Sequence, residues 1–210
     1  MAAASACLCI PMLLQQVFTG GSLYASVKAE TSLVDEDVMI AENMDSILLL
    51  QEEEWAKLSS GEKLSVLQTI ANIERNYFGL PNEVTVVSGA LEKDLLGHYN
   101  DNTHTVCISV DSLEHDDARE CLDTITHECY HSYQARQVDA LRGADKELKG
   151  LRLFQAARAY GQEYACYKDV DSDPEGYWNQ DLEKHARAYA IVAVTFYYEL
   201  IEKYLEEESS

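Results

Sequence analysis

Residues 121–134 read CLDTITHECYHSYQ, and His127, Glu128 and His131 within them form an H-E-x-x-H sequence. No Pro or Gly interrupts the chain from Asp116 to Leu141, so we predict one helix there. Residues four apart on a helix lie on the same face, about one turn from each other. Two imidazoles in that relation can bind one Zn²⁺, and the glutamate beside the first can act on a water at the ion.

The motif helix also carries an apolar stripe that would pack inward, formed by Leu122, Ile125, Cys129 and Tyr133. Apolar periodicity and turn residues around it predict further elements. Four further helices are predicted: one over about 45–58, one that starts after Ser59 as N-cap and ends before Gly79, one over 146–169 and one over 179–206. Strands are predicted over 84–87 and 105–110, with a turn over 97–103 between them. The predicted fold class is therefore α+β and predominantly helical, with a small sheet preceding the H-E-x-x-H helix.

The length of 210 residues suits one domain, which we place at residues 45–206. Residues 26–44 are expected to be a linker and residues 207–210 an acidic tail. The first 27 residues carry no charged side chain, and Cys7 to Leu14 is a short apolar run. We predict a signal peptide over residues 1–25 and a secreted or cell-surface protein, although no Lys or Arg marks its start. A cytoplasmic protein is the alternative.

A net charge of −21 argues against nucleic acid and anionic membranes as partners, because phosphates would be repelled. The apolar run is too short to span a bilayer, so no membrane span is expected in the mature chain. The six cysteines include no C-x-x-C spacing, which argues against a cysteine zinc site. They leave open whether any disulfide forms.

A catalytic zinc takes three protein ligands and keeps one position open, so a third ligand is needed beside His127 and His131. Glu183 is our first candidate, since two histidines and one glutamate are a known set. Ala186 and Ala190 follow it in the same predicted helix and would allow close approach to the motif helix. The alternatives are Glu163, on the preceding predicted helix, and His185.

Residues 182–190, LEKHARAYA, match the pattern E-x-x-A-x-x-[FY]-A with Glu183, Ala186, Tyr189 and Ala190 in register. With the H-E-x-x-H helix and the strands before it, the chain resembles the zincin metallopeptidases. It looks most similar to minimal gluzincin-type families, which include the phage-repressor-cleaving and radiation-response regulators. The resemblance implies a minimal zincin-like fold with Glu183 as the third ligand. Glu183 lies farther from the motif than in the compact families, and the predicted helix over 146–169 would be an insertion.

The sequence thus favours a zinc-dependent peptidase, with a peptide or protein substrate and Glu128 as the general base. The donor that would stabilise the oxyanion is open among Tyr99, Tyr177, His185 and Tyr189. Supporting contacts to the ligands are guessed for Thr124 and Gln134. One alternative is a zinc protein without catalysis, in which the metal is structural or the cleft only binds peptides. The other is an acidic helical interaction protein in which the motif is accidental.

Overall fold

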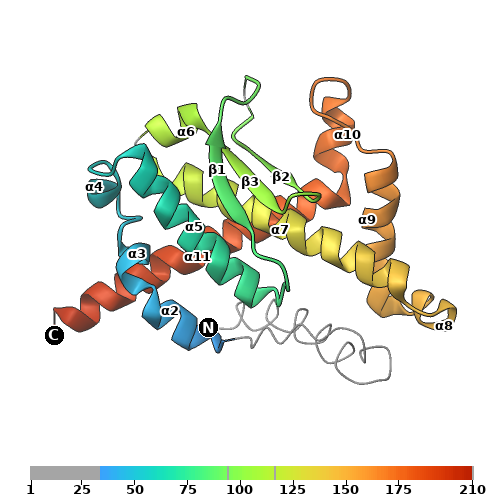
Figure 1. Ribbon diagram of the computed structural model, residues 1–210, viewed down its shortest axis with the longest axis horizontal. Helices are drawn as coiled ribbons and strands as arrows, with labels where there is room; N and C mark the ends of the chain where they lie inside the picture. The colour runs from blue at the N-terminus through green and yellow to red at the C-terminus, as the bar shows by residue number, and fades with distance from the viewer. Residues whose placement is uncertain (1–33, 94, 116, 210) are drawn as a thin grey trace.

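Figure 1 shows the computed structural model, which describes residues 34–209 except 94 and 116. The predicted signal peptide over residues 1–25 and the first part of the predicted linker lie outside the described residues. The described chain is predominantly helical with one three-stranded sheet ahead of the motif helix. The predicted fold class, α+β and mostly helical, is confirmed.

The motif helix is α7, Ala118–Gly143, and the other long elements pack around it (Figure 1). It begins at Asp117, whose side chain accepts from the backbone N–H groups of Arg119 and Glu120. Its apolar stripe is buried as predicted. The long C-terminal helix α11, Asp181–Glu208, crosses α7 at close range, and α5, Ser60–Tyr77, packs on it as well. These three helices therefore set the positions of the side chains that α7 and α11 turn toward each other.

The sheet has the order β1-β3-β2, formed by Thr85–Gly89, Thr105–Ser109 and Gly97–Asn100 respectively. Strand β1 is parallel to β3, while β2 is antiparallel to β3 and lies at the edge of the sheet beside α7. The expectation of turn structure throughout 97–103 was wrong for residues 97–100. These residues have polar side chains that favour turns, but they form a strand because they pair with β3 and contact α7.

Three short helices precede α5: α2 at Glu36–Glu42, α3 at Met44–Leu48 and α4 at Glu52–Trp55. Residues 36–42, which we expected to be part of a linker, are helical because Asp35 caps them and Ile40 is buried against the core. The single helix predicted over 45–58 is interrupted at Gln51, whose backbone is extended. One more short helix, α6 at Val110–Glu114, joins β3 to α7.

The segment between α7 and α11 is also less regular than predicted. In place of one helix over 146–169, it forms α8 at Lys146–Lys149, the 3₁₀ turn η3 at Arg152–Phe154 and α9 at Gln155–Ala165. A non-helical stretch then leads to α10, Pro174–Asn179. Helices α8 to α10 lie at the end of α7 that is remote from α2, α3 and α4 (Figure 1). Helix α11 continues to Glu208, so the predicted acidic tail begins as helix.

The four cysteines in the described part of the chain, Cys107, Cys121, Cys129 and Cys166, are all unpaired. Cys121 and Cys129 are buried on the packed face of α7, where they act as small apolar side chains. Within residues 34–209, the structure has no helix that combines the length and the apolar character needed to cross a membrane.

Candidate metal centre

Helix α7 places His127 and His131 on one face, as the four-residue spacing predicts, with their Nε2 atoms 3.0 Å apart. Both side chains are largely covered by neighbouring residues but still reach solvent. Together with Glu128 they form a cluster whose possible ligand atoms lie within 4.8 Å of one another. This cluster could hold a metal ion.

Glu183 approaches the same two imidazoles from α11. Its carboxylate oxygens lie 3.4 Å from Nε2 of His127 and 3.4 Å from Nε2 of His131, and its side chain is 1% exposed. Burial alone would raise the pKa of Glu183, but the two imidazoles and the hydroxyl of Tyr167 lower it to about 2. Its Oε2 is buried without a hydrogen bond, and the guanidinium of Arg187, one turn later on α11, lies 3.6 Å from it. Two imidazole nitrogens and a buried carboxylate are a donor set that suits a divalent cation such as zinc.

Gln134 links the two helices at this point. Its side-chain NH₂ donates to the backbone carbonyl of Leu182 on α11 (2.8 Å), so its Oε1 is left to accept from Nδ1 of His131 (2.7 Å). When the ring is neutral, a proton on Nδ1 leaves the lone pair of Nε2, the atom that faces Glu183, available to a metal ion. Gln134 therefore contacts one of the two imidazoles of the candidate centre. The hydroxyl of Thr124 donates instead to the carbonyl of Glu120 and contacts neither imidazole through that bond.

Glu128 lies between α7 and the edge strand β2 and is 8% exposed. Burial raises its pKa to about 7; Glu183 adds to the rise, while His131 and the backbone N–H of Tyr99 oppose it. Strand β2 comes this close because Gly97 has no side chain. A Cβ there would lie 2.5 Å from Cγ2 of Thr124 and 3.3 Å from Cγ of Glu128. The glycine at position 97 therefore allows β2 to approach Glu128 closely.

The alternative third ligands lie elsewhere. Both carboxylate oxygens of Glu163 accept backbone N–H groups at the start of α11, from Asp181 and Leu182, each at 2.8 Å. Glu163 is therefore a cap for the helix that carries Glu183. The ring of His185 pairs through Nδ1 with the hydroxyl of Tyr160 at 2.6 Å. Neither side chain is turned toward the two imidazoles.

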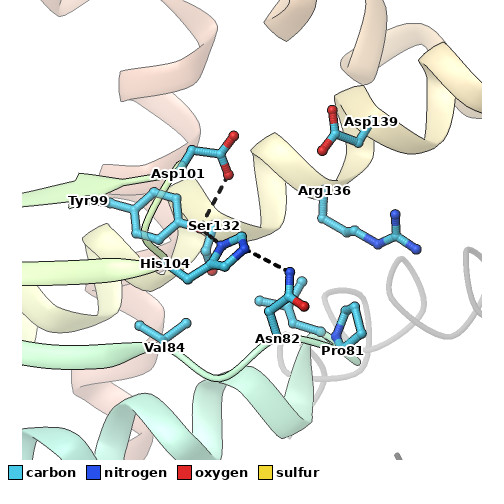
Figure 2. A pocket seen from close by; sticks show the side chains of 10 residues that line it. Pro81, Asn82, Val84, Tyr99, Asp101, His104, Ser132, Arg136 and Asp139 are labelled. Carbon is cyan, nitrogen blue, oxygen red and sulfur yellow. Dashed lines mark hydrogen bonds between the residues drawn. The ribbon is translucent and has the colours of Figure 1, made fainter. Parts of the chain in front are cut away.

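The candidate oxyanion donors are also dispersed. Figure 2 shows a small pocket in which the hydroxyl of Tyr99 contacts His104 (3.1 Å) and Asp101 (3.4 Å). None of the residues that line this pocket belongs to the cluster on α7. Tyr189 donates to Glu74 inside the core. Of the tyrosines that we named, Tyr177 is the one beside Glu183.

Sequence reasoning overlooked Tyr167. Its hydroxyl donates to Oε1 of Glu183 at 2.8 Å, although the residue belongs to a non-helical stretch with no motif of its own. The only available signal was its place in the helix predicted over 146–169, which suggested a packing role. The structure instead leaves its side chain exposed.

Comparison with known proteins adds no relative: no protein-family model, curated protein or solved structure matches this chain.

Proposed function

We propose that this protein is a zinc-dependent peptidase of zincin type, with His127, His131 and Glu183 as the metal ligands. The observation that carries the proposal is the meeting of these three side chains from α7 and α11, with both carboxylate oxygens of Glu183 within 3.4 Å of an imidazole Nε2. When bound, zinc supplies Lewis-acid activation of water and of the scissile carbonyl.

The chain's own residues supply the remaining steps. Glu128, buried beside the histidines, takes a proton from the attacking water and passes it to the nitrogen of the leaving amine. His131 is oriented by Gln134, and Glu183 is held by the packing of α11 on α7. Strand β2 runs beside Glu128 at the edge of the sheet, where it pairs with no further strand of the described chain. An extended peptide can bind there by main-chain hydrogen bonds beside the Tyr99 N–H that contacts Glu128. Peptides and proteins are therefore the proposed substrates. We also propose that this protein is secreted or displayed at the cell surface.

The first test measures the metal. We expect about one zinc per chain, lost in His131→Ala and kept in His115→Ala, which removes an exposed histidine at the end of α6. If the wild-type protein takes up no zinc, the metal-site proposal is wrong. The result would favour the alternative of a helical interaction protein in which the H-E-x-x-H motif occurs by chance.

The second test measures hydrolysis. Wild-type protein, Glu128→Gln and Glu120→Gln are incubated with a peptide library, and the products are identified by mass spectrometry. Glu128→Gln should keep its zinc and lose cleavage by at least about 10²-fold, because the proton acceptor is gone. Glu120→Gln, two turns earlier on α7, serves as the control. Zinc binding without cleavage by the wild type would favour the non-catalytic alternative.

A further inference from the structure

The segment between α7 and α11 is fastened to the first turn of α11. Glu163 of α9 caps two backbone N–H groups there, those of Asp181 and Leu182. The buried side chain of Gln180 then forms a two-point clamp on the backbone of Lys168. Its Oε1 accepts from the Lys168 N–H at 2.8 Å, and its NH₂ donates to the Lys168 carbonyl at 2.9 Å. The backbone beside Lys168 is thus held against the helix that carries Glu183.

The residue before this clamp is Tyr167. Its hydroxyl donates to Oε1 of Glu183 at 2.8 Å, and that oxygen is the one 3.4 Å from Nε2 of His131. The side chain is 47% exposed and follows the end of α9. One end of Tyr167 therefore touches the candidate centre while its ring borders solvent, where a substrate must enter. A phenol keeps its proton at neutral pH and is a hydrogen-bond donor there.

Two other hydroxyls near the centre contact groups other than Glu183 and the two imidazole rings. Tyr164 on α9 donates to the backbone carbonyl of His131 at 3.4 Å, and Tyr99 contacts His104 and Asp101. Tyr177 lies beside Glu183 and packs edge-on against Tyr167, so it is the rival. Tyr177 also interacts with Glu183 by hydrogen bonding. Tyr167 is distinguished from it by the 2.8 Å distance of its hydroxyl to Oε1 of Glu183 and by the clamp on Lys168.

We propose that the Tyr167 hydroxyl is a catalytic residue that donates a hydrogen bond to the oxyanion of the scissile carbonyl. This inference rests on the peptidase function proposed above. In the step it assists, the water oxygen bonds to the carbonyl carbon and the C–N bond then breaks. The proton that Glu128 takes from the water goes to the leaving nitrogen. Tyr167 keeps its own proton. Its hydroxyl stops donating to Glu183 and donates to the oxyanion instead.

The test compares Tyr167→Phe and Tyr177→Phe with Tyr164→Phe, which removes the hydroxyl of another partly exposed tyrosine from the same region. At saturating zinc, Tyr167→Phe should lower kcat by about 10²- to 10³-fold and change KM by less than about threefold, as expected for a lost oxyanion donor. A phosphinate analogue of the best-cleaved peptide should bind zinc-loaded Tyr167→Phe more weakly by a comparable factor in calorimetry. Zinc affinity, measured against a chelator, reports separately on any effect through Glu183.

Each outcome bears on a different claim. If the wild type cleaves peptides and Tyr167→Phe keeps its kcat and its affinity for the phosphinate, the inference is wrong and the peptidase function stands. If activity returns fully once zinc is saturating, Tyr167 only positions Glu183 and the catalytic role is overturned. A loss confined to Tyr177→Phe assigns the donor to Tyr177 instead. A zinc-loaded wild type without cleavage overturns the peptidase proposal, and this inference with it.

Discussion

Glu74 on α5 is a buried carboxyl that should make stability depend on pH. It is 3% exposed and accepts hydrogen bonds from Tyr189 and Tyr197 of α11. Burial raises its pKa to about 7 from 4.5, and the two hydroxyls reduce the rise without abolishing it. The group is protonated more readily in the folded than in the unfolded state, so its contribution is complete below pH 4.5 and is lost as pH rises through 7.

The magnitude follows from the size of the shift. A difference of about 2.5 pKa units at about 1.4 kcal/mol per unit corresponds to roughly 3 kcal/mol of stability lost between about pH 4.5 and 7. Glu74→Gln carries no charge at any pH. Its amide can still accept from one tyrosine and donate to the other, so both contacts survive. The variant should therefore match the wild type near pH 5 and exceed it by up to about 3 kcal/mol at pH 8.

The assay is urea unfolding of chelator-treated protein from pH 5 to pH 8, followed by circular dichroism. Other groups titrate in this range, so the informative quantity is the difference between variant and wild type at each pH. Glu53→Gln, on the exposed side of α4, controls for the removal of one negative charge from an acidic protein. If the free-energy difference for Glu74→Gln is the same at pH 5 and pH 8, the buried carboxyl does not titrate as argued.

Two further predictions concern the supports of the candidate centre. Gly97→Ala should push β2 away from α7, because its Cβ would lie 2.5 Å from Thr124, and should lower the free energy of unfolding by about 1–3 kcal/mol; an unchanged urea midpoint would contradict this. Glu163→Gln replaces one of the two oxygens that cap α11 with an NH₂ and removes a charge from the helix N-terminus. It should cost about 1–2 kcal/mol and weaken zinc binding, measured by chelator competition, whereas Glu175→Gln on α10 should leave both near wild type.

Local patterns were sufficient for some features and misleading for others. The apolar stripe and unbroken helical run around the motif predicted α7 and its buried face, because periodicity reports on a helix that packs along its whole length. Strand β2 was missed since Gly97 and the polar residues after it favour turns in isolation. Only the partner strand β3 and the surface of α7 make that backbone a strand.

The candidate site divides in the same way. Helical geometry alone requires His127 and His131 to share a face, with Glu128 beside them, since residues four apart stand one turn from each other. Which distant carboxylate meets them depends on how α11 crosses α7, and spacing along the chain carries no information about that crossing. Glu163 and Glu183 were therefore both candidates until packing made one the helix cap and turned the other toward the imidazoles. Tyr167 joined the centre for the same reason, through contacts between segments far apart in the chain.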